Sequence, residues 1–140
     1  MSKKFYQAVH QIITTGHWIT DRISAELKVY DMTEPQFNVL RILRGAKGNP
    51  LTVQEILEQM VQRSSNITRI VDRLIGKGMV ERKECATNRR KMDVSITEKG
   101  LTQLKKLDQK VAQFYAPMTE NLNDAELESL VELIKKLQQR

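Results

Sequence analysis

The spacing of apolar residues predicts long amphipathic helices at both ends of the chain. From residue 5 to about residue 28, apolar or small residues recur in steps of three and four, which is typical of a helix with one buried face. These positions are Phe5, Val9, Ile12, Gly16, Ile19, Ile23 and Leu27. Near the other end, Thr97 is a natural N-cap for a second long helix. Its apolar positions are Leu101, Leu104, Leu107, Val111, Phe114 and Met118. A last helix is expected after Asn123 and Glu126, which have the spacing of a reciprocal N-cap pair.

Three shorter helices are predicted between these long ones. Thr33 and Gln36 have capping-box spacing at the start of one helix, which should end between residues 45 and 50. Another helix is expected over about 52–60. A fourth helix should begin at Ser64 as N-cap and end at the GKG sequence of residues 76–78, because glycine readily takes the left-handed C-terminal conformation. Its inward stripe is Ile67, Ile70, Val71 and Leu74.

A β-hairpin is predicted after the fourth helix. The segment MDVSIT alternates apolar and polar residues, which is the period of a half-buried strand, and the short segment MVERKEC precedes it. The polar residues ATN between them favour a turn. Three adjacent cations, Arg89, Arg90 and Lys91, would then lie at an exposed tip, which indicates an anionic partner.

The order of these elements predicts a mainly α fold with a small β-hairpin wing. A length of 140 residues favours one domain, 1–140, and the helix pair followed by a hairpin is typical of a winged helix-turn-helix. We expect its DNA-binding core at about 32–97, and dimerisation helices at about 4–29 and 98–140. The long outer helices have more apolar surface than a small centre can cover, so a two-fold homodimer is expected, with an intramolecular bundle as the alternative. The expected interface residues are Phe5, Val9, Ile12, Leu127, Leu130, Ile134 and Leu137.

The distribution of charge supports a nucleic-acid partner. The chain has a net charge of +6, and the whole excess lies between residues 62 and 92. A generic solvated surface usually mixes the two signs more evenly. We find no Gly-rich phosphate loop, no metal-ligand spacing and no nucleophile–base pair, so neither an enzyme nor a cofactor or metal is expected. A single cysteine, Cys85, and the lack of a signal peptide or long apolar run predict a cytoplasmic protein. We expect that thiol to be passive.

The fourth helix and the wing contain the candidate DNA contacts. With the apolar stripe inward, the other face of the helix presents side chains of the types that contact bases and phosphates in the major groove. A wing arginine could enter the adjacent minor groove. The candidates are Ser64, Ser65, Asn66, Thr68, Arg69, Arg73, Arg89, Arg90 and Lys91. The alternatives are a winged-helix module for protein–protein contact and a non-specific DNA-binding protein.

The run from residue 51 to residue 100 resembles the DNA-binding core of the MarR family of bacterial transcriptional regulators. The motifs that carry the resemblance are SSNITRIVDRLIGKGMVER and the wing with its ITEKG exit. The family's wing signature, Asp-X-Arg, here reads Asn88, Arg89, Arg90, so an amide replaces the acid and Arg90 takes the minor-groove position. Leu57 and Val61 also replace residues that are often alanine and glycine. The resemblance implies a homodimer on a pseudo-palindromic double-stranded operator, acting as a repressor and released by a small ligand or an oxidant.

Overall fold

A computed structural model describes residues 1–61 and 66–139 and confirms the predicted fold class. The chain folds in the order α1 (Lys3–Lys28), α2 (Glu34–Gly45), β1 (Leu51–Thr52), α3 (Val53–Gln59), α4 (Ile67–Gly76), β2 (Val80–Glu84), β3 (Met92–Ile96), α5 (Glu98–Tyr115), the short 3-10 helix η1 (Ala116–Met118) and α6 (Asp124–Gln138). The three strands form one antiparallel sheet in the order β1-β3-β2.

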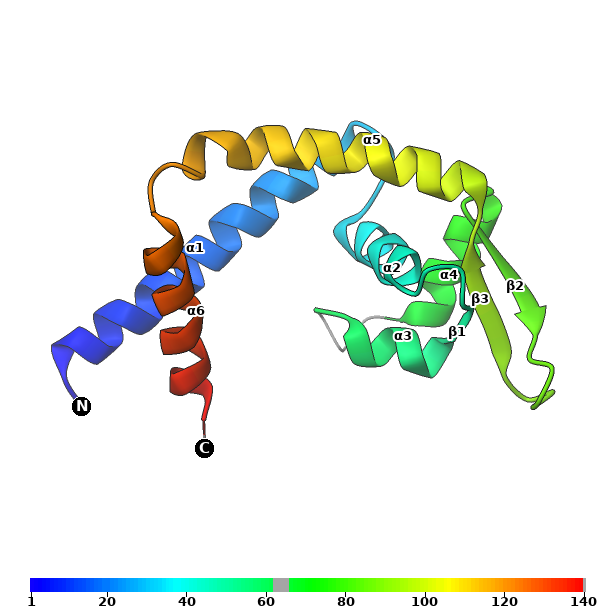
Figure 1. Cartoon of the computed structure of the whole chain (residues 1–140), viewed down its shortest axis with the longest axis horizontal. Helices are drawn as coiled ribbons and strands as arrows, with labels where there is room; N and C mark the ends of the chain where they lie inside the picture. The colour runs from blue at the N-terminus through cyan, green and yellow to red at the C-terminus, as the bar shows by residue number, and fades with distance from the viewer. Residues whose placement is uncertain (62–65, 140) are drawn as a thin grey trace.

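The molecule has a compact half and an extended half. Figure 1 shows α2, α3, α4 and the sheet clustered at one end, with α5 running from the sheet across to the other end. The N-terminal part of α1 and the whole of α6 project from that far end, and both termini lie there. The hairpin of β2 and β3 extends from the compact half with its tip in solvent.

The core of the compact half joins residues from helices and strands that are distant in the sequence. Leu40 of α2, Ile56 of α3, Leu74 of α4, Val94 of β3 and Leu104 of α5 are all fully buried. Since these side chains come from residues up to 64 positions apart in sequence, α4 and the wing strands are fixed against the rest of the protein by the same core.

The N-cap predictions are confirmed at three helices. Thr33 and Gln36 form the reciprocal capping box of α2, and Asn123 and Glu126 form that of α6. Thr97 accepts a hydrogen bond from the backbone N–H of Gly100 and so caps α5. These caps satisfy helix N–H groups that lack a partner within the helix.

Three details differ from the prediction. Ser64 lies outside the described residues, and the N-cap of α4 is Asn66, whose side chain accepts from the N–H of Arg69 at 3.2 Å. Leu101 was expected to face inward but is 41% exposed, because Gly100 takes the inward position in the first turn of α5. The two-residue strand β1 was not predicted, since among the described residues it pairs with β3 alone, through Leu51 with Val94 and Thr52 with Asp93.

Among the described residues, no helix combines the length and the apolar character that crossing a membrane requires.

Candidate nucleic-acid interface

Helix α4 has one buried face and one exposed polar face. Ile67, Val71 and Leu74 pack into the core, as their spacing predicted. The exposed side presents Arg69 and Arg73, one helical turn apart, with the hydroxyl of Thr68 beside them. The helix therefore offers two guanidinium groups and a hydroxyl to a partner without disturbing the core.

The start of α4 is organised by Asn66. Its side-chain oxygen accepts the N–H of Arg69 as the N-cap, and the residue remains exposed. Asn66 therefore presents its side-chain amide at the N-terminus of α4 and not along the exposed face of the helix. Ser64 and Ser65, the other two candidates at this end, lie outside the described residues.

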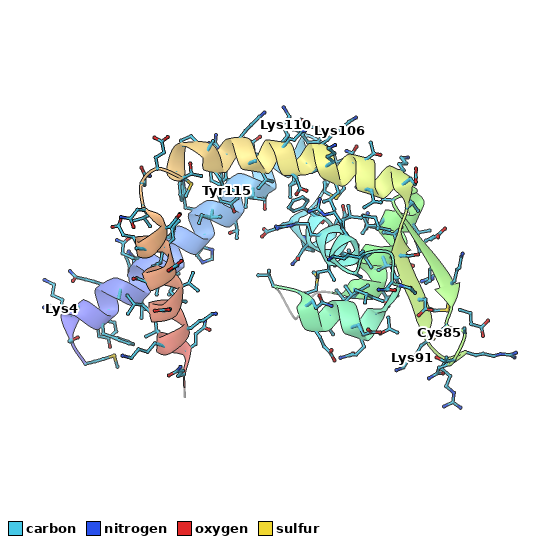
Figure 2. The ribbon with its side chains drawn as sticks, in the orientation of Figure 1. Lys4, Cys85, Lys91, Lys106, Lys110 and Tyr115 are labelled. Carbon is cyan, nitrogen blue, oxygen red and sulfur yellow. The ribbon has the colours of Figure 1, made fainter. Side chains whose placement is uncertain are left out.

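The wing is a regular hairpin with an ordered basic tip. Strands β2 and β3 pair in register from Val80 with Ile96 to Glu84 with Met92. Beyond the strands, the N–H of Cys85 donates to the carbonyl of Lys91 at 3.0 Å, which continues the ladder by one bond. Figure 2 shows Cys85 and Lys91 at the far end of the hairpin, where long basic side chains point away from the protein.

Asn88 fixes the turn that carries the wing cations. Its side-chain oxygen accepts from the backbone N–H of Arg90 at 3.0 Å, and its carbonyl accepts from the N–H of Lys91 at 3.0 Å. Asparagine side chains commonly form such local turns. The amide of Asn88 thus orders the backbone of the turn. The side chain of Arg90 takes no part in these hydrogen bonds and is exposed.

The two neighbouring cations of the tip differ in their surroundings. The Nε of Arg89 lies 4.0 Å from Glu84, but the Arg89 side chain is 94% exposed, so this ion pair contributes little. Among the described residues, no carboxylate pairs with the guanidinium of Arg90 or with the ammonium of Lys91. The tip therefore presents its positive charge to solvent.

Wing hydrogen bonds also act on Cys85. The hydroxyl of Thr87 lies 3.4 Å from the Cys85 sulfur and is the main reason that the pKa of this thiol lies below its ordinary value. Backbone hydrogen bonds from Thr87 and Asn88 lower the pKa further, while desolvation and the charge of Asp93 oppose them.

An ion pair that the sequence did not predict joins the wing to α4. The guanidinium of Arg82 on β2 lies 3.0 Å from the carboxylate of Asp72 on α4. Both side chains are partly exposed, so the pair contributes at most about 1 kcal/mol. It joins the root of the wing to the exposed face of α4, in an arrangement that the shared core already fixes. No local pattern signals a contact between side chains on two different elements.

The predicted interface residues lie on the extended half. Phe5 and Ile12 of α1 are 42% and 41% exposed, and Leu127, Leu130 and Leu137 of α6 are exposed to a similar degree. Val9 and Ile134 are half-buried. None of these residues belongs to the core of the compact half.

The arrangement of α3, α4 and the β2–β3 hairpin defines the class of the protein. Two short helices pack against each other, the second exposes a cationic polar face, and a hairpin with a basic tip is fixed beside it. This is a winged helix-turn-helix.

Comparison with known proteins identifies the family. Residues 30–91 match the model of the MarR family. An uncharacterised HTH-type transcriptional regulator of Bacillus cereus is 31% identical over 112 residues, which are 79% of this chain and 73% of the relative. The HTH-type transcriptional regulator MhqR of Bacillus subtilis is 29% identical over 119 residues, which are 85% of this chain and 81% of the relative.

Solved structures agree with this assignment. A mutant of MarR from E. coli, complexed with operator DNA, superposes with a TM-score of 0.79 at 27% identity and covers 99% of this chain and 100% of that one. A MarR-like regulator from Bacillus cereus shares the fold with a TM-score of 0.82 at 22% identity over 98% of this chain and 97% of that one. The chain belongs to the MarR family of DNA-binding transcriptional regulators, so the predicted resemblance is confirmed.

Proposed function

We propose that the protein is a homodimeric repressor that reads a pseudo-palindromic operator with α4 and the wing. The observation that carries the proposal is the joint placement of the cations: Arg69 and Arg73 on the exposed face of α4, and Arg90 on a wing that Arg82 and Asp72 fix beside it. Helix α4 would enter the major groove, with Asn66 and Thr68 near base edges and backbone. Ser64 and Ser65 belong to the same proposed surface by their sequence.

The wing would reach the neighbouring minor groove. Arg90 is the proposed groove-inserting residue, since its side chain is exposed and its backbone is held by Asn88. Narrow A·T-rich minor grooves concentrate negative potential, which attracts an inserted arginine. Arg89 and Lys91 would contact the flanking phosphates.

Helix α6 supports the homodimer. None of its residues, all of which the structure describes, is buried, although its side chains include Leu127, Leu130, Val131, Leu133 and Leu137 at 43–64% exposure. An isolated 15-residue helix is marginally stable in water, so this helix needs a partner surface. We propose the corresponding α1 and α6 of a second copy. The proposed division into a core at 32–97 and dimerisation helices at 4–29 and 98–140 follows from this arrangement.

Dimerisation would place two copies of α4 about one helical turn of DNA apart, roughly 34 Å. A dimer that covers such a site excludes other proteins from the same promoter DNA. Repression is therefore the proposed outcome.

We propose an open cleft beside α2 as the site of a small anionic effector. The cleft has a volume of about 540 Å³ and is lined by Asn38, Arg41, Ile42, Arg44, Gly45 and Gln59. Arg44 pairs with Asp108 of α5, while Arg41 lies over the ring of Phe37, 5.6 Å from its centroid. Because Asp108 already pairs with Arg44, the guanidinium of Arg41 and the two amides are the groups that suit a carboxylate ligand. Benzoate is a suitable probe: calorimetry should detect its binding to the wild type and weaker binding to Arg41→Gln. If neither protein gives a heat of binding, the effector site at this cleft is contradicted.

DNA recognition is tested by fluorescence anisotropy on promoter DNA, first from upstream of the protein's own gene and, if needed, from duplexes selected out of a random pool. The Arg90→Ala variant should bind the operator about tenfold or more weakly, because a base or groove contact from arginine is worth roughly 1–3 kcal/mol. Lys106→Ala is the matched control. Figure 2 places Lys106 on the outer side of α5, away from the wing tip, and its removal also deletes one positive charge.

The same titrations separate the alternatives. Operator binding should fall steeply with salt and survive an excess of unrelated duplex. A protein–protein module would show no salt-dependent DNA binding at all. A non-specific DNA-binding protein would be displaced from the operator equally well by any duplex. If Arg90→Ala and Lys106→Ala lose operator affinity to the same extent, the role of Arg90 is refuted.

A further inference from the structure

Lys77 connects the C-terminal end of α4, the recognition helix of the proposed complex, to the C-terminal end of α1. It is the C-cap residue of α4, and its ammonium donates to the backbone carbonyl of Asp31 in the turn between α1 and α2. The same ammonium lies 3.2 Å from the side-chain oxygen of Gln36 and 3.7 Å from the carboxylate of Asp31. The ammonium thus donates to two acceptors, the Asp31 carbonyl and the Gln36 side-chain oxygen, while the 99% exposed Asp31 carboxylate is only a nearby opposite charge.

The receiving turn is itself held in one conformation. Asp31 has φ of 53°, a left-handed value that ends α1, and the N–H of Met32 donates to the carbonyl of Leu27. Met32 and Leu27 are buried, so the turn is fixed to the core. A contact to this turn is therefore a contact to the C-terminal end of α1.

Gln36 adds a buried acceptor. It is 5% exposed, and its side-chain oxygen accepts both the N–H of Thr33, as part of the α2 capping box, and the ammonium of Lys77. If the lysine is removed, this buried oxygen keeps the N–H of Thr33 but loses its charged donor, and hydrogen bonds from charged donors are the stronger ones.

The position of Lys77 also differs from that of the candidate DNA contacts. Its backbone ends α4 and its ammonium meets the carbonyl end of α1, where helix dipoles stabilise positive charge, although the nearby N-terminus of α2 opposes this effect. Its side chain is 25% exposed, unlike the freely exposed arginines of the α4 face. These features separate Lys77 from the residues proposed to contact DNA, although it lies within the same basic segment.

We propose that Lys77 is a positioning residue for operator recognition. It fixes the C-terminal end of α4 to the α1–α2 turn and so sets the direction of the recognition helix relative to the dimerisation helices. In a dimer, two such joints determine the separation and angle of the two recognition helices, and therefore which half-site spacing is preferred. The inference rests on the proposed homodimeric operator binding.

The test compares Lys77→Met with Lys106→Met, which removes an exposed lysine of α5. Each variant is titrated by anisotropy against the selected operator, the same operator with one base pair inserted between its half-sites, and an unrelated duplex, over a range of salt. Circular dichroism and light scattering confirm helix content and mass.

A positioning role predicts a specific pattern. Lys77→Met should lose about tenfold in operator affinity, tolerate the inserted base pair better than the wild type does, and keep both its affinity for unrelated duplex and its salt dependence. Lys106→Met should match the wild type. If Lys77→Met fails to fold, Lys77→Arg keeps the positive charge but changes the reach and shape of the side chain that meets the Asp31 carbonyl and Gln36, and a smaller loss in the same direction is expected.

Other outcomes would overturn the inference. If Lys77 contacts a phosphate, its removal weakens every duplex alike and lowers the salt slope by about one. If all affinities and the spacing preference stay unchanged in a folded Lys77→Met, or in Lys77→Arg where Lys77→Met does not fold, the contact positions nothing. A wild-type protein without sequence preference, or one that is monomeric, would refute the proposed function itself, and the inference with it.

Discussion

Gly100 lies where α5 begins and where the wing strands join the core, and replacing it with alanine should destabilise the protein. A Cβ at this position would lie 2.2 Å from the carbonyl oxygen of Met79 and 2.7 Å from the Cγ1 of Ile96. The first neighbour is backbone and cannot rotate away. That same carbonyl accepts the N–H of Thr97 at 3.0 Å, so moving it also breaks a hydrogen bond that leads into the α5 cap.

The magnitude follows from three contributions. Forcing a methyl group into this contact costs about 1–3 kcal/mol by overpacking. Loss of the hydrogen bond between Thr97 and Met79 costs about 1 kcal/mol. Alanine regains about 1 kcal/mol because it is a better helix former than glycine. The net expectation for Gly100→Ala is a loss of roughly 1–3 kcal/mol in the free energy of unfolding.

Gly76→Ala provides the matched control. Gly76 is the last residue of α4, and a Cβ there would meet nothing within 4 Å. The same substitution should therefore leave stability unchanged or raise it by up to about 1 kcal/mol. Urea unfolding of both variants at one protomer concentration gives the comparison, since a dimer's apparent stability depends on concentration. Gly100→Ala as stable as Gly76→Ala would refute the close approach of α5 to the start of β2.

Two further predictions concern the ends of the molecule. Leu130→Lys should convert the proposed dimer to a monomer of 16.2 kDa in light scattering. The control Glu132→Lys, on the opposite side of α6, should remain dimeric. A dimeric Leu130→Lys protein would contradict an α6 interface. Cys85 should be alkylated by iodoacetamide with a pH midpoint below that of the same thiol in urea, because hydrogen bonds led by the one from Thr87 favour the thiolate in the folded state. Stability from these bonds is present at high pH and is lost as pH falls through the lowered pKa; equal midpoints would show that the wing turn does not form as described.

Local signals predicted most of the helices correctly. The capping box of Thr33 and Gln36 and the cap at Thr97 depend on residues within one turn, so the sequence contains the whole of the information. The start of α4 was harder, because serine and asparagine are comparable N-caps. Propensity favoured Ser64 as readily as Asn66, and the observed cap is Asn66.

Features that depend on distant partners could not be predicted in this way. Strand β1 is only two residues long, and it exists because Leu51 and Thr52 pair with Val94 and Asp93. The inward position of Gly100 depends on Met79, which belongs to the other side of the hairpin. The contact of Lys77 with Asp31 spans 46 residues, and its sequence context identifies Lys77 only as one of several basic residues. The exposed residues of α4 that are proposed to contact DNA can be predicted from local periodicity. The contact of Lys77 with Asp31 that would orient them cannot.

Orientation matters here because each half of the proposed dimer has few candidate base contacts. In the proposed complex, one copy would present Arg69, Arg73 and Arg90 as its main cations toward DNA, and such a small set would not distinguish an operator from the many competing sites of a genome. Linking two copies makes the second half-site contact intramolecular, and the gain is lost when geometry forbids simultaneous engagement. A rigid connection between α1 and α4 would therefore hold the two α4 helices of the proposed dimer at one spacing. Dimerisation through the apolar faces of α1 and α6 would then increase sequence discrimination. Any ligand that displaced α1 or α2 by a small amount would then release DNA without touching the recognition helix.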